Sequence, residues 1–185
     1  DYFYCSAISL AIFDPSQQQH ILELMAEAKA NGVITVFDSN YRAILWPDQT
    51  RAKEVISQAW QHSCIGLPSW NDEKELFDYK TPEDCIQALH QWGVQEVAIS
   101  QGQQPVILSC NDGKQHIDAL HVTDVIDTTA AGDSFNAAYL MARMHGEIPE
   151  TAIQWGLRLA SNVVQHHGAL IPRDKLPSWQ ALTNE

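Results

Sequence analysis

Short apolar segments alternate with longer amphipathic segments along the chain, and this alternation constrains the fold more than any other feature. The clearest apolar segment is VITVFD at 33–38, a continuous run that ends in an Asp. Such runs are typical of buried parallel strands. Helical patterns precede and follow it, at 14–32 and 49–60. This order predicts an α/β fold with a doubly wound, mainly parallel sheet flanked by helices.

Turn and capping residues delimit the expected elements. Asp14 or Ser16 can cap the first long helix, which Gly32 would end, and Thr81 with Pro82 opens another. A turn at 111–113 predicts a hairpin between 105–110 and 115–122. We found no repeat or linker, and therefore expect one domain over 1–185. The remaining expected strands are 2–8, 64–68 and 94–100, and the remaining expected helices are 71–79, 133–145 and 149–166.

Composition excludes several classes of protein. The chain has 11 Lys and Arg against 23 Asp and Glu, a formal net charge of −12. A nucleic-acid surface would need a basic face, so we expect no nucleic-acid partner. No apolar run is long enough to span a bilayer, so we expect no membrane partner. The four cysteines are far apart in the sequence, which predicts no zinc site or disulfide framework and fits a reducing cytoplasm.

The stretch VIDTTAAGDSFNAAYL at 125–140 places small residues and an Asp at the start of an expected helix. Ala130, Ala131 and Gly132 leave backbone N–H groups open to a ligand, and the helix dipole adds positive potential there. Such a loop suits phosphate oxygens. Asp133 could then accept the proton of a hydroxyl that attacks a phosphoryl group. An ordinary helix N-cap explains the same residues, and this stretch by itself leaves both interpretations open.

The motif DTTAAGDSFNAAYL resembles the C-terminal signature of the ribokinase-like (PfkB) carbohydrate kinases. Four further segments resemble one branch of that family, the 2-keto-3-deoxygluconate kinases: SAISLAI, VFDSNYRAILW, LPSWNDEKELF and QHHGALIPR. Ala130 agrees with that branch, because most other relatives have Gly at this place. The resemblance implies a ribokinase-like fold and transfer of the γ-phosphoryl of Mg-ATP to the 6-hydroxyl of an acid sugar.

The resemblance also implies roles for individual residues. Asp133 would be the catalytic base, and the N–H groups of Ala130, Ala131, Gly132 and Asp133 would form an anion hole. Arg42 would contact the sugar carboxylate, which a guanidinium can bind through two parallel hydrogen bonds, with Asn40 and Tyr41 beside it. The residues expected near ATP are Ser100, Gly102, Asn162, Gly168 and Ala169.

One more acidic residue is implied near the metal and the phosphates. Glu73 would correspond to the acid of the family's Asn-x-x-Glu motif, which influences Mg²⁺ binding. Ser69 would replace the Asn of that motif, although it lies four residues before Glu73 and not three. The expected cofactors are therefore ATP and Mg²⁺, with Glu73 acting on the metal indirectly.

The resemblance covers the C-terminal portion of the family's single kinase domain. The family's first strand, its Gly-Gly segment and its small β lid have no counterpart in these residues, so we expect an exposed sheet edge. Two alternatives stay open: another sugar or nucleoside kinase of the family, and a non-catalytic nucleotide-binding module. Association into a homo-oligomer is also left open.

Overall fold

The structure is a computed structural model that describes residues 1–111 and 113–183. Its internal contacts divide the chain into two compact units. The first unit comprises residues 1–101 and 107–115, and the second comprises residues 102–106 and 116–185. That the chain forms one kinase domain stays a prediction.

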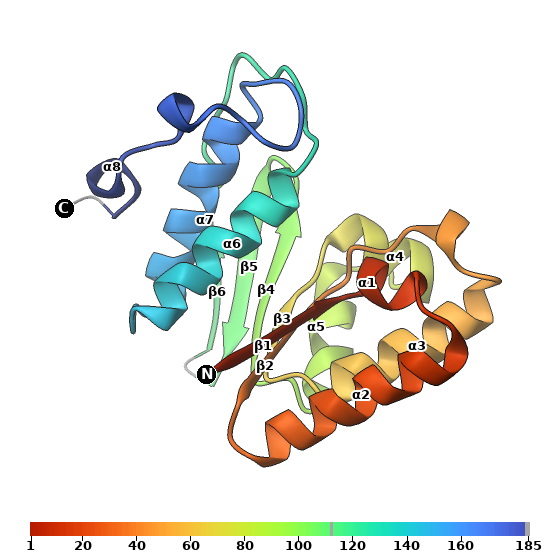
Figure 1. Cartoon of the computed structure of the whole chain (residues 1–185). Helices are drawn as coiled ribbons and strands as arrows, with labels where there is room; N and C mark the ends of the chain where they lie inside the picture. The colour runs from red at the N-terminus through yellow and green to blue at the C-terminus, as the bar shows by residue number, and fades with distance from the viewer. Residues whose placement is uncertain (112, 184–185) are drawn as a thin grey trace. The chain divides into compact units, whose positions relative to one another are not determined.

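Strands and helices alternate between residues 2 and 101, as the sequence pattern predicts (Figure 1). The strands are β1 (Tyr2–Ser6), β2 (Ile34–Asp38), β3 (Ile65–Leu67), β4 (Glu96–Gln101), β5 (Gln104–Cys110) and β6 (Gly113–Ile117). The α-helices are α1 (Ala7–Ala11), α2 (Pro15–Ala30), α3 (Gln49–Gln61), α4 (Trp70–Phe77), α5 (Pro82–Gln91), α6 (Ala131–Met144), α7 (Pro149–Val163) and α8 (Trp179–Thr183). Two short 3₁₀ helices are η1 (Ala43–Leu45) and η2 (Arg173–Lys175).

The strands form a six-stranded sheet in the order β1-β2-β3-β4-β5-β6. The pairs β1–β2, β2–β3 and β3–β4 are parallel, with Tyr2 opposite Ile34 and Val36 opposite Ile65. A two-residue connection joins β4 to β5, which only an antiparallel hairpin allows. The prediction of a mainly parallel sheet flanked by helices is confirmed.

Local capping explains where the long helices begin. The side chain of Asp14 accepts hydrogen bonds from the N–H groups of Ser16 and Gln17, and Gln17 completes a capping box. Thr81 caps α5 in the same way, with Asp84 as its partner. The strand predicted at 2–8 ends at Ser6, because the Ser6 hydroxyl caps a short helix at once. The strand predicted at 115–122 is also wrong in its bounds, since β6 begins at Gly113 and ends at Ile117.

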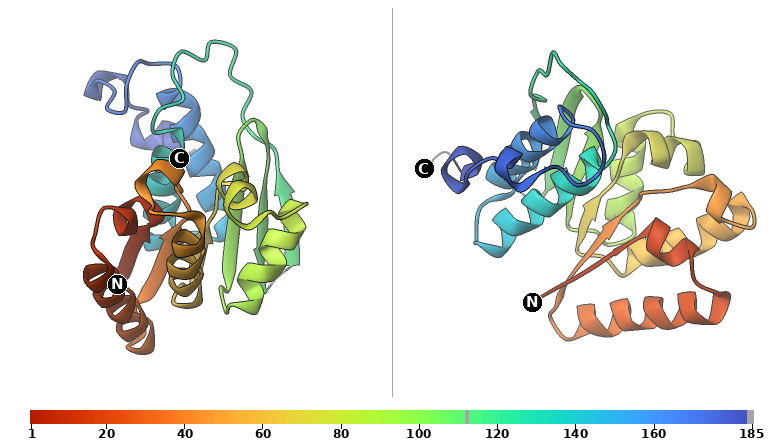
Figure 2. Two further views of the ribbon diagram at one scale, coloured as in Figure 1. Left: turned by 90° about the vertical axis from the view of Figure 1, so that its right-hand side faces the viewer. Right: turned by 45° about the horizontal axis from the view of Figure 1, so that its top comes forward.

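The core of the first unit is aromatic and aliphatic. Trp60 of α3 is fully buried and meets Phe37 of β2 edge-to-face, with ring centroids 4.7 Å apart. Helices α2 and α3 lie alongside one another in this unit (Figure 2). Leu22 and Met25 of α2 and Val55 and Ile56 of α3 are buried in the same cluster. This packing holds the carboxyl ends of β2 and β3, where polar residues follow.

The second unit is built on the packing of α6 against α7 (Figure 2). The two helices approach closely at Gly156, where a Cβ atom would lie 2.6 Å from the Phe135 ring. Phe135 in turn stacks on Tyr139. Because Phe135 lies two residues after Asp133, this contact sets the position of the start of α6.

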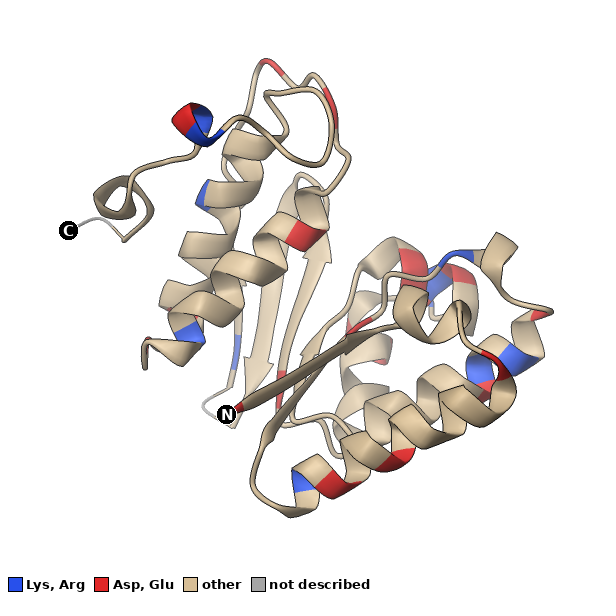
Figure 3. Ribbon diagram, in the orientation of Figure 1, with Lys and Arg blue, Asp and Glu red and all other residues tan. Residues whose placement is uncertain are grey.

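Basic side chains do not gather on one element. Lys and Arg form small separate segments on several helices and strands of the described chain (Figure 3). No helix among the described residues has the length and apolar character needed to cross a membrane.

Candidate active site

The start of α6 is a turn of small residues with open backbone. Ala130 is the N-cap and has a left-handed conformation, with φ of +60°. Its carbonyl accepts a hydrogen bond from the Ser134 N–H, at 2.9 Å. Gly132 and Asp133 follow in the first turn, and both are exposed. A Cβ atom on Gly132 would meet nothing within 4 Å, so a ligand can approach the backbone here.

One of the expected anion-hole groups is already engaged. The N–H of Ala131 donates to the carbonyl of Thr128, at 3.1 Å. An anion that used this N–H would have to break that bond or share it. The exposed first turn of α6 and its dipole remain suited to an anion.

Asp127 ties this turn to the segment that follows α7. Its carboxylate accepts hydrogen bonds from the N–H groups of Thr129, at 2.8 Å, and Gly168, at 2.9 Å. The side chain and backbone of Thr129, together with the N–H of Gly168, hold the pKa of Asp127 down at about 2. Asp127 is therefore ionised at neutral pH and links the segment 126–130 to Gly168.

The left-handed conformation of Ala130 predicts a stabilising substitution. A Cβ atom is strained at positive φ, and Gly relieves that strain at some cost in unfolded-state entropy. We expect Ala130→Gly to raise the free energy of unfolding by about 0.5–1 kcal/mol, measured by urea denaturation. Ala131→Gly, one residue later inside the helix, should lower it by up to about 1 kcal/mol. Equal losses in both variants would contradict this account of the turn.

A cavity of about 330 Å³ lies within the second unit, a volume at the low end for small-molecule sites. Its wall is mostly small and apolar, with a few polar groups. The lining residues come from the β4–β5 turn, the segment after β6, the start of α6 and one side of α7: Gly102, Gln103, Ala119, Leu120, His121, Val122, Val125, Thr128, Ala131, Leu157, Ala160, Ser161 and Val164. The cavity therefore reaches the same turn that carries the candidate anion site.

The residues expected near ATP differ in whether they line this cavity. Gly102 lines the cavity. Ser161 and Val164 also line it, and Asn162 lies between them in the sequence. Gly168 binds Asp127, and Ala169 next to it is exposed. Sequence reasoning assigned 115–122 to a hairpin strand, and so missed the cavity-lining segment 119–125. The apolar residues of this segment could have indicated a binding surface. Two of them, Leu120 and Val125, are substantially exposed.

Ser100 belongs to the first unit and lies at the end of β4. Its N–H donates to the carbonyl of Pro68, at 2.9 Å, and it forms a parallel bridge with Ser69. These contacts join the end of β4 to the turn that precedes α4.

The carboxyl end of β2 carries the second group of expected site residues. The carboxylate of Asp38 accepts hydrogen bonds from the Tyr4 hydroxyl, at 3.0 Å, and from the Asn40 N–H, at 3.1 Å. The Ser69 N–H donates to the Ser39 hydroxyl, at 2.8 Å, which ties this segment to the start of α4. The polar contacts of Asp38 and Ser39 thus hold the loop that leads to Arg42.

Tyr41 and Arg42 differ in exposure. Tyr41 is buried in the core of the first unit, whereas the side chain of Arg42 is 52% exposed. Asp72 of α4 faces both residues: its Oδ2 accepts from the Tyr41 N–H, at 3.1 Å, and its Oδ1 lies 3.7 Å from Arg42 Nη1. Burial raises the pKa of Asp72, and the Arg42 guanidinium partly offsets this. Sequence reasoning missed Asp72, although it stands three residues after Ser69.

Glu73 is fully buried next to Asp72 in α4. Its Oε2 lies 3.9 Å from the Cys85 thiol, and its Oε1 makes no hydrogen bond to any residue that the structure describes. Burial raises the pKa of this carboxyl group to about 8. The expected indirect role of Glu73 in metal binding stays a prediction, and any such effect would have to pass through its neighbours. Asp72 is the partly exposed acid of this turn.

The buried Glu73 predicts a pH dependence of stability. The native state keeps its proton between pH 4.5 and about 8, where the unfolded state has lost it. Stability from this group is therefore full below pH 4.5 and is lost as pH rises toward 8. We expect Glu73→Gln to remove this loss, a difference on the order of a few kcal/mol. Urea unfolding between pH 5 and 8 measures it, with the exposed Glu75→Gln as control; parallel pH profiles of wild type and Glu73→Gln would contradict it.

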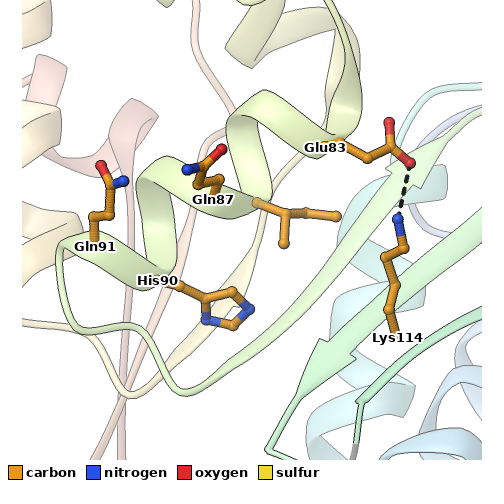
Figure 4. A pocket seen from close by; sticks show the side chains of 6 residues that line it. Glu83, Gln87, His90, Gln91 and Lys114 are labelled. Atoms are coloured by element: carbon orange, nitrogen blue, oxygen red, sulfur yellow. Dashed lines mark hydrogen bonds and ion pairs between the residues drawn. The ribbon is translucent and has the colours of Figure 1, made fainter.

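A shallow depression on the first unit offers no catalytic group (Figure 4). Glu83 and Lys114 form an ion pair across it, with 3.3 Å between Oε1 and Nζ. His90 beside them is engaged at both ring nitrogens, at 2.8 Å from the Val94 carbonyl and at 2.8 Å from the Ser109 hydroxyl. Because the carbonyl can only accept, a neutral His90 carries its hydrogen on Nδ1. We interpret this histidine as structural.

Comparison with known protein families shows which family the chain belongs to. The family model of pfkB family carbohydrate kinases matches residues 1–176. The chain belongs to the pfkB family of carbohydrate kinases. The motif at 127–133 lies within the matched residues, and in the structure Ala130, not Asp133, is the N-cap of α6. The catalytic role of Asp133 stays a prediction.

Both the curated proteins and the solved structures that match this pfkB chain include kinases. The 2-dehydro-3-deoxygluconokinase of Escherichia coli K12 is 39% identical over 181 residues, which cover 96% of this chain and 59% of that protein. The structure of aminoimidazole riboside kinase from Salmonella enterica, complexed with aminoimidazole riboside and an ATP analogue, matches 99% of this chain at 25% identity and a TM-score of 0.84. An E. coli structure named for ribokinase II, in complex with ATP and Mg²⁺, matches 91% at 25% identity and a TM-score of 0.79.

Coverage of these relatives is partial. The chain spans about 59% of the length of the first curated relatives and 53–61% of these two structures. The ribokinase-like fold predicted from the sequence is confirmed by these matches.

Proposed function

We propose that this pfkB chain takes part in the ATP-dependent phosphorylation of 2-keto-3-deoxygluconate at its 6-hydroxyl. The observation that carries the proposal is the DTTAAGD turn at the start of α6, with an exposed carboxylate and an open backbone in one helical turn. The curated relatives named 2-dehydro-3-deoxygluconokinase supply the substrate class.

The proposed chemistry is a single displacement. Asp133 takes the proton from the sugar hydroxyl as its oxygen forms a bond to the γ-phosphorus. The bond from that phosphorus to the bridging oxygen breaks, and ADP leaves with the electron pair. The first-turn N–H groups of α6 and its dipole stabilise the negative charge on the transferring group.

The cavity of the second unit supports the nucleotide part of the proposal. A flat apolar ring system can pack against Leu120, Val125 and Leu157, while Thr128 and Ser161 offer polar groups at the wall. The cavity and the start of α6 share Ala131, so a nucleotide in it can direct its phosphates toward the α6 turn.

Mg²⁺ would be held mainly by the nucleotide phosphates and water. The described residues contain no group of three or more His, Cys, Asp or Glu side chains that could hold a metal ion. This fits Mg²⁺ in kinases, which keeps several waters and binds through phosphates with few protein ligands. When bound, it neutralises charge on the phosphates.

Arg42 supports the acid-sugar part of the proposal. Its guanidinium is half exposed, and a guanidinium can bind a carboxylate through two parallel hydrogen bonds. A neutral sugar lacks the carboxylate that this charge-assisted pairing requires. We therefore infer that Arg42 selects acid sugars, and that Asn40 beside it belongs to the same substrate surface.

The test is ADP release by this chain with Mg-ATP and a panel of sugars headed by 2-keto-3-deoxygluconate. We expect release with the acid sugar and much less with fructose or ribose. Release with a neutral sugar alone would favour another kinase of the family. ATP binding without release for any sugar would favour a nucleotide-binding module.

A further inference from the structure

Asp72 contacts the Arg42 segment through both of its carboxylate oxygens. Oδ2 accepts from the Tyr41 N–H, at 3.1 Å, and Oδ1 lies 3.7 Å from Nη1 of Arg42. The same Nη1 donates to the Tyr41 carbonyl, at 2.7 Å. Asp72 stands in the first turn of α4, where the helix dipole favours a negative charge. One carboxylate therefore holds the backbone before Arg42 and faces its side chain.

These contacts involve one nitrogen of the guanidinium, Nη1. Within the described part of the chain, Nε and Nη2 of Arg42 make no hydrogen bond, and the side chain is half exposed. The Nε and Nη2 hydrogens point along parallel directions, which is the geometry that a carboxylate accepts. Holding Nη1 fixes the plane of the guanidinium and leaves that pair of donors available.

We propose that Asp72 is a positioning residue that holds Arg42 so that its Nε and Nη2 groups receive the carboxylate of the acid sugar. This proposal rests on the proposed function. The charge of Asp72 predicts the opposite effect on binding, because a carboxylate repels an anionic ligand near it. If Asp72 acted only through its charge, removing that charge would strengthen acid-sugar binding; if Asp72 positions Arg42, removal weakens it.

The variant that separates these effects is Asp72→Asn. The Asn side-chain oxygen can still accept from the Tyr41 N–H, while the charge facing Arg42 is lost. We expect the affinity for 2-keto-3-deoxygluconate, measured by calorimetry, to fall about tenfold, with little change for fructose. The matched control is Asp78→Asn, which removes an exposed carboxylate that pairs with Lys53 at 3.3 Å. In the background Arg42→Ala, the substitution Asp72→Asn should add almost no further loss.

A second measurement does not depend on sugar binding. The ¹⁵N order parameter of the Arg42 Nε–H group reports how firmly the guanidinium is held in the free protein. We expect it to fall in Asp72→Asn and to stay unchanged in Asp78→Asn. An unchanged value in Asp72→Asn, or tighter binding of the acid sugar, overturns the positioning role. If wild type shows no preference for the acid sugar, the proposed function fails, and the order parameter alone still decides whether Asp72 positions Arg42.

Discussion

Replacing Asp133 with Asn should lower the turnover of sugar phosphorylation at least about 10³-fold, equivalent to about 4 kcal/mol of transition-state stabilisation. The amide keeps the size of the side chain but cannot take the proton of the attacking hydroxyl. Asp133 lies in the first turn of α6 and is exposed to solvent, so the substitution should leave the helix intact. Coupled detection of ADP release at saturating sugar and ATP measures the effect.

Binding of ATP separates a lost base from a damaged site. The affinity of Asp133→Asn for a non-hydrolysable ATP analogue should stay within about threefold of wild type, since the variant removes a step rather than a binding group. Asp124→Asn removes an exposed carboxylate nine residues earlier and should retain full turnover. Turnover of Asp133→Asn near that of Asp124→Asn would rule out Asp133 as the base.

A Val at position 156 should destabilise the second unit by about 3 kcal/mol. The Cβ atom alone would lie 2.6 Å from one carbon of the Phe135 ring and 3.0 Å from the Phe135 carbonyl oxygen. Backbone cannot move aside as a flexible side chain can, so α6 and α7 would have to separate. This cost exceeds the roughly 1 kcal/mol by which Gly is disfavoured within a helix. Urea unfolding, followed by intrinsic tryptophan fluorescence, to which Trp155 of α7 contributes, measures the change.

A second substitution tests whether the Phe135 ring causes the loss. Phe135→Leu removes ring atoms from the contact and should recover part of the stability of Gly156→Val, so that the two substitutions are less than additive. Strict additivity would mean that the ring is not the obstacle. The same variant should also reduce kinase turnover, because Phe135 lies two residues from Asp133 on the first turns of α6.

Several elements could be predicted because their signals are local. The capping box of Asp14 and Gln17 and that of Thr81 and Asp84 lie within four residues of sequence. The apolar run at 33–38 predicted a buried parallel strand, and β2 pairs in parallel with both neighbours. The turn at the start of α6 was likewise visible, because small residues and an Asp before an apolar helix form a local pattern.

The environment of the acidic residues in α4 was not predictable in this way. Asp72 and Glu73 are adjacent in sequence, yet one faces Arg42 at 3.7 Å and the other is fully buried beside Cys85. Which of the two enters the core depends on how α4 packs on residues remote in sequence, such as Tyr41 for Asp72 and Cys85 for Glu73. The family resemblance implied a role for Glu73, and the structure shows Asp72 as the acid that faces Arg42, the residue expected to bind the sugar.

The sequence by itself determined the order of strands and helices, the α6 turn with Asp133 and the family to which the chain belongs. These depend on neighbouring residues, whose spacing sets periodicity, capping and backbone freedom. Tertiary structure alone decided the strain at Ala130, the cavity beside Ala131, the close contact of Gly156 with Phe135 and the pairing of Asp72 with Arg42. Each of these depends on burial and on distances between residues remote in sequence, which only the packed chain brings together.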